Sequence, residues 1–491
     1  MAADAPTPPP TLHRIAMCCD FFPPRVGGVE QHIWSLSCAL RALGHEVCVI
    51  TGRYAPPGGS GGGGDAPRVG VRYLSHGLRV YHLPHLPMAD QASAPTYFGL
   101  LPLLRAVLLR ERATLAHGHA ATSVLTHDFL QCARALGLRT VFTDHSLFGA
   151  ADFASVNVNK YLALALREAS AAIAVSRASQ ANLHQRTGLP LARICCIPNA
   201  VDGAELAPPE ARRGGGGAGA SSRRCPRTVV VLSRLVFRKG CDVLVELIPL
   251  ALARWPDLRF LVGGEGPKRA ALEAMAAALP PALRGSVQLV GHVPRERVAA
   301  HLARGALFLN CSLTESFCIA ILEAACAGCH VLSTAVGGVP EVLPPRMATL
   351  AAAPTAGALL EAMGLALQRA AATDPAAQHA EAAALYTWPS VARRTAALYD
   401  AVAAQERPTL AQRFHALAGL GPLYGPVAAV LAALMHLMVL ALGWLAPEAD
   451  IEAALPAPRQ GELLRALGGS AQGAAAVEGR LSQHLAAVGR A

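Results

Sequence analysis

Two blocks of alternating strand-like and helix-like segments constrain the fold of this chain most. In the first block, the apolar stretch "IAMCCD" from Ile15 is followed by the loop "FFPPRVGGVE", the amphipathic stretch "QHIWSLSCALRALG" and the apolar stretch "EVCVIT". This order of strand, helix and strand predicts a parallel sheet with right-handed crossovers. A glycine-rich stretch, "ARRGGGGAGASSRRCPR", ends the block, and "TVVVLSRL" begins a second block of the same kind.

The pattern predicts an α/β fold of two Rossmann-like domains that face each other across a cleft. A chain of 491 residues is too long for one compact core, which agrees with two domains. Ligands of such sheets bind beyond the carboxyl ends of the strands. The segments that we expect are a disordered tail (1–11), an N-terminal acceptor domain (12–210), a glycine-rich linker (211–227), a C-terminal nucleotide-sugar domain (228–400), a juxtamembrane segment (401–423), a transmembrane helix (424–445) and a lumenal tail (446–491).

The transmembrane helix is predicted from the stretch "GPVAAVLAALMHLMVLALGWLAP". It has no formal charge from Pro426 to Leu445, and about 20 apolar residues are enough to span a bilayer. Tyr424 and Trp444 would lie at the two interfaces, and the arginines on the N-terminal side predict cytosolic domains. We therefore expect a single-pass protein. The alternative is a very hydrophobic helix that packs on the C-terminal domain.

Composition narrows the classes of partner. The net charge of +10 suits phosphates or anionic lipid surfaces, whereas aromatic residues are only 5% and no basic run is interleaved with them, so we expect no nucleic acid. The 13 cysteines are scattered and odd in number, which predicts reduced thiols in a cytosolic protein. Cys326 and Cys329 lack a second pair of the kind found in zinc sites.

A basic loop follows the first strand of the second block, in "SRLVFRKGCD". Arg234 and Lys239 lie five residues apart there, and a helix is expected to begin near Asp242. Two cations at the end of a strand and beside a helix N-terminus form a phosphate site. The alternative is a solvated basic turn.

Two glutamates, Glu315 and Glu323, follow the strand "ALFLNCS". With a helix from about Ser316, the backbone amides of Ser316, Phe317 and Cys318 would point at a bound anion. Eight helical residues rise about 12 Å, which matches an elongated ligand such as a nucleotide sugar. Its sugar would lie near Glu315 and its ribose near Glu323. The alternatives are helix-end stabilisation for Glu315 and a buried carboxylate paired with a cation for Glu323.

Other candidate groups follow strands of the first block. Gly27 and Gly28 would let the backbone approach a ligand closely. His145, in "FTDHSLFG", is expected to donate a hydrogen bond in the cleft, because the adjacent residues Asp144, His145 and Ser146 point in different directions and cannot form a catalytic triad. His117 and His119 could be metal ligands, but no acidic partner is nearby, so we expect no metal.

Seven stretches together resemble one group of enzymes. The motif E-x7-E, the R-x4-K loop and the early Gly-Gly loop are similar to those of the retaining GT-B glycosyltransferases. Within them the chain resembles the catalytic subunits of phosphatidylinositol N-acetylglucosaminyltransferase, densely from Arg14 to Leu343. The stretches are "DFFPPRVGGVEQHIWSLS", "TVFTDHSLFG", "IPNAVD", "SRLVFRKG", "VGGEGPKR", "LNCSLTESFCIAILEAA" and "GGVPEVLP". The inserts at 56–67 and 211–226 and the tail after Leu445 match nothing in this group.

The resemblance implies transfer of N-acetylglucosamine from UDP-GlcNAc to phosphatidylinositol with retention. This is the first step of glycosylphosphatidylinositol-anchor synthesis, in a multisubunit complex of the endoplasmic reticulum membrane. By the same resemblance, Arg234 and Lys239 would stabilise the leaving diphosphate, and Glu315, Glu323 and His145 would hold the donor. No cofactor or metal is implied, since the two cations and the helix N-terminus offset the diphosphate charge.

Other functions fit the residues less well. A glycoside hydrolase needs two carboxylates about 5–10 Å apart across one bond, rather than two along a helix. No G-x-G-x-x-G pattern with a ribose-binding acid follows a first strand, as an NAD-dependent oxidoreductase would require. Another retaining lipid-directed glycosyltransferase, or a non-catalytic subunit of such a complex, stays open.

Overall fold

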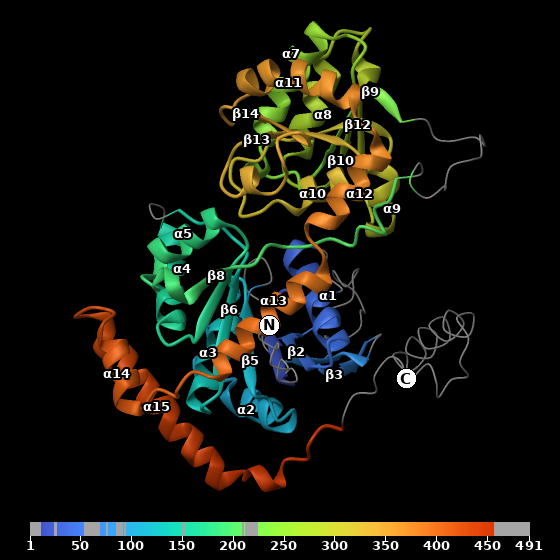
Figure 1. The fold of residues 1–491 in the computed structure, drawn as a ribbon. Helices are drawn as coiled ribbons and strands as arrows, with labels where there is room; N and C mark the ends of the chain where they lie inside the picture. Colours follow the sequence, from blue (N-terminus) through green and yellow to red (C-terminus); the bar gives the residue numbers. More distant parts are fainter. Residues whose placement is uncertain are drawn as a thin grey trace, which may run out of the picture.

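The structure is a computed structural model of the whole chain. It describes residues 11–23, 27–53, 69–74, 77–84, 92, 95–149, 153–208, 211 and 224–455. The predicted tail over 1–11 (apart from residue 11), the insert at 56–67, most of the linker over 211–227 and the chain after residue 455 lie outside the described residues. Figure 1 shows two domains, one built on each sheet.

The N-terminal domain is built on an eight-stranded sheet in the order β3-β4-β2-β1-β5-β6-β7-β8. All neighbouring strands are parallel except β3 and β4, which pair antiparallel at one edge. The strands are β1 (Arg14–Cys18), β2 (Glu46–Gly52), β3 (Gly70–Tyr73), β4 (Arg79–Leu83), β5 (Leu115–His119), β6 (Arg139–Asp144), β7 (Ala171–Ala174) and β8 (Ile194–Cys196). The helices are α1 (Gly28–Ala42), α2 (Leu101–Arg110), α3 (Val124–Ala135), α4 (Phe153–Leu166) and α5 (Arg177–Thr187).

The second domain contains a six-stranded, wholly parallel sheet in the order β11-β10-β9-β12-β13-β14. Its buried faces are rich in valine, leucine and isoleucine, as expected where helices cover both sides. The strands are β9 (Cys225–Leu232), β10 (Arg259–Gly263), β11 (Val287–Gly291), β12 (Gly305–Asn310), β13 (His330–Thr334) and β14 (Ala348–Ala351). The helices are α7 (Cys241–Arg254), α8 (Arg269–Ala278), α9 (Arg295–Leu302), α10 (Ile319–Cys326), α11 (Ala356–Ala372) and α12 (Pro375–Leu385).

Helix α13 (Trp388–Ala403) returns to the N-terminal domain, where it packs against α1. Its residues Val391, Tyr399 and Val402 are buried with the strands of the first sheet, and the Tyr399 hydroxyl lies 2.6 Å from His117 Nδ1. This crossing differs from the expected boundary, which assigned all residues up to 400 to the C-terminal domain. The buried residues at 391, 395, 399 and 402 have helical spacing, but periodicity does not say which domain covers them.

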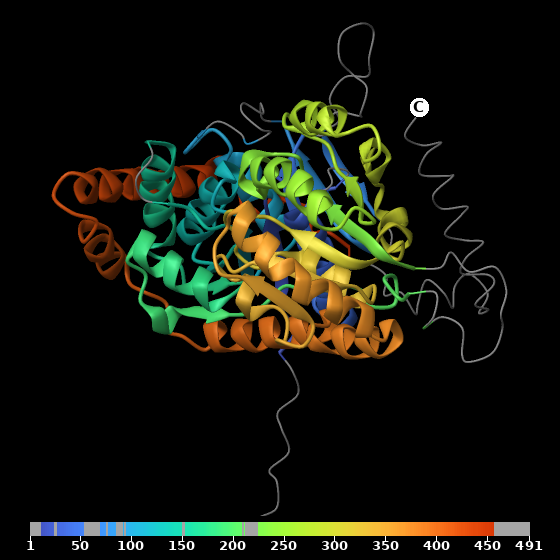
Figure 2. The same ribbon diagram turned by 90° about the horizontal axis from the view of Figure 1, so that it is seen from above.

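The last two described helices are α14 (Leu410–Ala418) and α15 (Tyr424–Leu445). They run along the outside of the N-terminal domain (Figures 1 and 2). Helix α15 is the one helix in the described part of the chain that is long and apolar enough to cross a membrane. It coincides with the predicted span. It packs on α3, however, and not on the C-terminal domain as the sequence alternative had it.

Candidate functional site

The candidate site lies where the carboxyl ends of β6 and β12 meet between the domains. Ser316 Oγ donates a 2.5 Å hydrogen bond to the carbonyl oxygen of His145. A second contact joins Glu341 of the C-terminal domain to the start of α5 in the N-terminal domain. The Glu341 carboxylate accepts hydrogen bonds from Arg177 N at 2.7 Å and Ala178 N at 2.9 Å. The loops after the strands of both sheets therefore share one interface, as ligand sites of parallel sheets do.

Lys239 and Glu315 form the charged centre of this interface. Strand β9 ends at Leu232, and a short 3₁₀ turn over Phe237–Lys239 brings the Lys239 ammonium into a hydrogen-bonded ion pair with Glu315 Oε1. Ser312 Oγ donates to the same carboxylate oxygen at 2.8 Å. Burial alone would lower the pKa of Lys239, but the neighbouring carboxylate raises it above its ordinary value. Lys239 is therefore a fixed cation at neutral pH.

Arg234 lies on the same loop and is exposed. The charge of Arg234 acts to lower the pKa of Lys239, because the two cations lie close enough to repel each other. Lys239, Arg234 and Glu315 therefore lie close together, and their roles toward a donor stay predictions. Two cations with one paired carboxylate leave a net positive site, which favours a bound anion.

The pair Gly337-Gly338 lies directly beneath the backbone of Glu315. Gly337 has a φ of +53°, and Gly338 N donates a 3.0 Å hydrogen bond to Glu315 O. A Cβ at Gly338 would lie 2.1 Å from Ser316 O, which is a backbone atom. Only glycine permits this approach, so the pair fixes the position of the loop that carries Glu315.

We expect Gly338→Ala to lower the free energy of unfolding by ~1–3 kcal/mol, because the added methyl group overpacks a backbone contact. Chemical denaturation of the purified protein measures this change. The matched control is Gly357→Ala in α11, where an added Cβ meets nothing within 4 Å. Equal stabilities of the two variants would contradict the close approach at Gly338.

The start of α10 differs from the prediction. The helix begins at Ile319 rather than near Ser316, and Cys318 is its N-cap with a φ of +67°. The side chains of Phe317 and Cys318 are buried in the core of the second domain, so neither side chain faces a ligand. Glu315 therefore precedes the helix by four residues, and the separation from Glu323 is not a rise along one helix. The sequence did not indicate this later start of the helix, because residues 316–318 are equally compatible with a helical turn.

Gly27 and Gly28 lie at the start of α1, opposite α10. Gly27 is the extended N-cap of α1, and a Cβ at Gly28 would lie 3.4 Å from Ile319 Cδ1. The N-terminal ends of two helices from different domains thus approach each other beside Glu315. The N-terminus of each helix carries partial positive charge.

Glu323 is buried in α10 and pairs with Arg295. Its Oε1 lies 2.6 Å from Arg295 Nη1, and Glu205 lies 3.4 Å from the other guanidinium nitrogen. Burial raises the pKa of Glu323 and Arg295 opposes that rise. The second glutamate therefore forms a pair of its own, separate from Lys239 and Glu315. Arg295 was missed in the sequence, although its place at the start of α9, just after β11, marks it as a residue at a strand's carboxyl end.

Three histidines gather behind the site. The rings of His32, His119 and His145 offer nitrogens that all lie within 4.8 Å of one another, and His119 Nδ1 is 3.3 Å from His145 Nε2. Burial lowers the pKa of His32 to about 4, and burial with the neighbouring imidazoles lowers the pKa of His119 and His145 well below 6.5. The cluster is neutral at pH 7, so His145 can hydrogen-bond an uncharged group. His32 was not singled out in the sequence.

We expect the protein to lose stability as the pH falls from 6.5 towards 4. In this range the unfolded chain binds protons at His32 and the folded chain does not, since its pKa is depressed to about 4. The contribution of His32 is complete above pH 6.5 and declines by up to ~1.4 kcal/mol per pH unit below it. Urea unfolding at pH 7.5, 6.5 and 5.5 measures the slope. His32→Gln should show a shallower slope, and an identical slope would contradict the assignment.

Comparison with known proteins shows relatives along most of the chain. The family described as PIGA (GPI anchor biosynthesis) matches residues 65–152, and glycosyl transferases group 1 matches 226–369. A phosphatidylinositol N-acetylglucosaminyltransferase subunit of Arabidopsis thaliana is 42% identical over 446 residues, 91% of this chain and 94% of the relative. The human protein of the same name is 41% identical, over 91% of this chain and 88% of its own length.

Solved structures share the fold at low identity. Sucrose-phosphate synthase of Thermosynechococcus elongatus superposes with a TM-score of 0.63 at 21% identity, over 79% of this chain and 98% of its own. The catalytic domain of starch synthase IV of Arabidopsis thaliana gives 0.60 at 16% identity, over 80% and 100%. These neighbours confirm the predicted GT-B fold. The identity and coverage of the relatives show that the chain belongs to the PIG-A family of phosphatidylinositol N-acetylglucosaminyltransferase subunits.

Proposed function

We propose that this protein transfers N-acetylglucosamine from UDP-GlcNAc to phosphatidylinositol, with retention at the anomeric carbon. The reaction is the first step of glycosylphosphatidylinositol-anchor synthesis. The observation that carries the proposal is the cationic cluster of Lys239, Arg234 and Glu315 in a chain that covers 94% of a relative named for this activity. The cluster argues against a non-catalytic subunit, because an inactive chain has no need of it.

In the proposed mechanism, Lys239 and Arg234 face the diphosphate of the donor. Negative charge grows on the diphosphate as the bond to the sugar breaks, and fixed cations at the developing charge lower the barrier. The start of α10 and the start of α1 add backbone dipoles on the two sides. Glu315 accepts hydrogen bonds from the sugar hydroxyls, and His145 contacts the transferred sugar. Glu323 binds the ribose from beside Arg295.

No metal is needed in this scheme, since the cations already offset the diphosphate charge. Three neutral imidazoles are a suitable ligand set for zinc, so the histidine cluster provides a direct check. We expect transfer activity to survive exhaustive treatment with EDTA unchanged. A loss of activity that zinc or manganese restores would contradict metal-independent transfer.

The relatives are named as one subunit of a transferase, and we propose that this chain also works in a complex with other subunits. We place it at the endoplasmic reticulum membrane, with both catalytic domains in the cytosol. The apolar helix α15 and a lipid acceptor support a membrane site.

Complementation tests the proposal in cells. In cells without this transferase activity the anchor is not made, so we expect no display of anchored proteins at their surface. Expression of this chain should restore that display, and expression of Lys239→Ala should not. If wild-type protein is produced, joins the other subunits and still restores nothing, the proposed function is wrong. Restoration by both chains would instead support a non-catalytic role.

A further inference from the structure

The loop that follows strand β6, called here the β6 loop (residues 145–149), lies between the two domains. Its first residue, His145, is the histidine that the proposed mechanism places at the transferred sugar. The C-terminal domain contacts this loop twice: Ser316 Oγ donates to His145 O at 2.5 Å, and Arg238 Nη2 lies 3.5 Å from Leu147 O. A shift of the loop would therefore move His145 relative to the residues that face the donor.

On the side of its own domain, the β6 loop is held by one guanidinium group. Arg186, in helix α5, donates from Nη1 to Asp144 Oδ2 at 2.9 Å and from Nε to Asn159 Oδ1 at 2.6 Å. Asp144 is the last residue of β6 and comes directly before His145. Asn159, in α4, donates from Nδ2 to Gly149 O at 3.0 Å. Arg186 is thus connected to both ends of the loop.

Asn182 connects the same guanidinium group to the middle of the loop. It lies one turn before Arg186 on α5, and its Oδ1 is 3.4 Å from Arg186 Nη1. Asn182 Nδ2 donates to Phe148 O at 3.0 Å, and Phe148 N donates to Asn182 Oδ1 at 3.5 Å. The guanidinium carbon of Arg186 also lies 4.9 Å from the centroid of the Phe148 ring. The start, the middle and the end of the loop therefore all depend on contacts that converge on Arg186.

Asp144 and Arg186 form a buried ion pair, with side chains that are 0% and 2% exposed. Asp144 Oδ1 also accepts a 3.2 Å hydrogen bond from Ser146 N, within the loop. A buried ion pair is often no more stabilising than apolar residues of the same volume. The planar guanidinium of arginine, however, presents its donors in a fixed fork, so it sets the direction of each hydrogen bond. The arrangement therefore suits the orientation of the loop more than the stability of the fold.

We propose that Arg186 is a positioning residue for transfer: it sets the orientation of the β6 loop and, through the loop, the place of His145 at the transferred sugar. Arg186 itself does not reach the donor, because its side chain is buried. The inference rests on the proposed function, since that function gives His145 its contact with the sugar. Loss of the fork should affect the sugar half of the donor and spare the diphosphate half at Lys239.

Arg186→Lys tests the proposal without removing the buried positive charge. Lysine keeps a cation beside Asp144, but its ammonium cannot bond Asp144 and Asn159 together with the geometry of the fork. We expect kcat for transfer of GlcNAc to phosphatidylinositol to fall about 10–100-fold in the assembled complex, because a small misplacement of a catalytic group is costly. Isothermal titration should show normal affinity for UDP. Unchanged transfer by a folded Arg186→Lys protein would overturn the proposal.

A double variant separates positioning from a general loss of stability. If Arg186 acts through His145, Arg186→Lys should slow transfer no further in a protein that already carries His145→Ala. It should still lower the midpoint of thermal unfolding by the same amount as in the wild-type background. Losses of transfer that multiply in the double variant would overturn the proposal, because Arg186 would then act independently of the histidine.

Asn182→Ala keeps the test informative if Arg186→Lys fails to fold. This change removes the two hydrogen bonds to the backbone of Phe148 and leaves the pair of Asp144 and Arg186 intact. It should lower kcat in the same way but less, with UDP binding again unchanged. Normal kcat in Asn182→Ala would contradict the role of these contacts in holding the loop.

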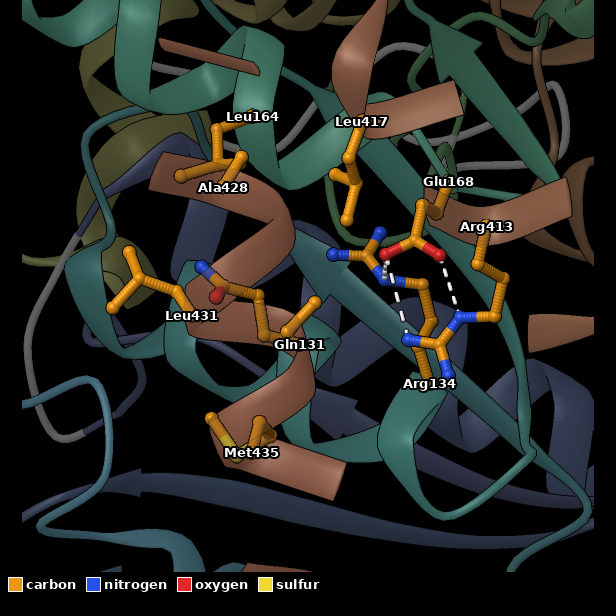
Figure 3. A pocket seen from close by; sticks show the side chains of 10 residues that line it. Gln131, Arg134, Leu164, Glu168, Arg413, Leu417, Ala428, Leu431 and Met435 are labelled. Atoms are coloured by element: carbon orange, nitrogen blue, oxygen red, sulfur yellow. Dashed lines mark hydrogen bonds and ion pairs between the residues drawn. The ribbon is translucent and has the colours of Figure 1, made fainter. Parts of the chain in front are cut away.

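The matched control is Arg134→Lys. Figure 3 shows Arg134 beside Glu168, and the two side chains are 6% and 7% exposed, with Nε and Oε2 3.8 Å apart. Arg134 lies in the last turn of α3, which precedes the start of β6, whereas the β6 loop follows its end. Arg134→Lys should lose stability and keep normal transfer. An equal loss of transfer in this control would assign the effect to stability and overturn the proposal.

The wild-type complex distinguishes the two ways in which this experiment can fail. If the assembled wild-type complex transfers no GlcNAc, the proposed function is wrong and this inference falls with it. If the wild-type complex and Arg186→Lys transfer GlcNAc equally well, the proposed function stands and the positioning role of Arg186 alone is wrong.

Discussion

Replacement of Lys239 by alanine is expected to lower kcat/KM for the proposed transfer about 10²–10³-fold, the usual effect of removing one donor to developing charge. Lys239 is held as a cation by Glu315, and it follows the strand whose end carries Arg234. The variant should also bind UDP more weakly, because the cation faces the diphosphate before and after the bond breaks. The fold should survive, since the side chain is a quarter exposed.

Arg227→Ala is the matched control for this variant. Arg227 lies on the same strand, β9, but at its other end, and it pairs with Asp257 as Lys239 pairs with Glu315. Loss of that exposed pair should change stability by less than about 1 kcal/mol and leave transfer intact. Near-normal activity of Lys239→Ala in a folded protein would rule out its role at the diphosphate.

Replacement of Glu315 by glutamine is expected to lower transfer about 10²-fold while leaving UDP binding within about threefold of normal. Glutamine keeps the size of the side chain and removes the charge that accepts from Lys239 and Ser312. The sugar would lose its charged acceptor and keep only the weaker amide oxygen, but Lys239 would remain available to the diphosphate. The two variants therefore differ in which half of the donor they affect.

Isothermal titration with UDP and steady-state transfer rates measure the two effects separately. Glu273→Gln is the control, because Glu273 is an exposed carboxylate paired with Arg269 and far along the chain from the interface. Since Lys239 and Glu315 touch, the double variant should lose less than the sum of the single losses. Additive losses would show that the pair does not act as a unit.

Much of the fold could be predicted from the sequence because buried parallel strands are short apolar runs between helices. Strand β9, for example, stands out as "TVVVL" directly before a basic loop. Strands β3, β4 and β14 were missed, and β3 shows one reason: its side chains are largely exposed, so it has no apolar pattern. The return of α13 to the first domain depends on tertiary packing, which no local pattern encodes.

Lys239 and Arg234 follow β9 and Glu315 follows β12, as the sequence indicated, and the topology brings the ends of these strands together. It did not place the start of α10, since the positive φ of Cys318 is set by the contacts of the loop and not by its composition. For Glu323 the structure shows the alternative, a buried carboxylate paired with a cation. The sequence did not identify that cation, because Arg295 comes from another helix. For α15, length and hydropathy indicate affinity for lipid but not which element the helix packs on.

Transfer in reconstituted membranes tests the central claim most directly. Membranes without endogenous activity receive this chain and its partner subunits, with UDP-[³H]GlcNAc and phosphatidylinositol, and Glu315→Gln is assayed in parallel. The expected result is labelled GlcNAc-phosphatidylinositol from the wild-type protein and about a hundredth as much from the variant. Equal label from both, or no label from the assembled wild-type complex, would contradict the assignment of this chain as the catalytic subunit.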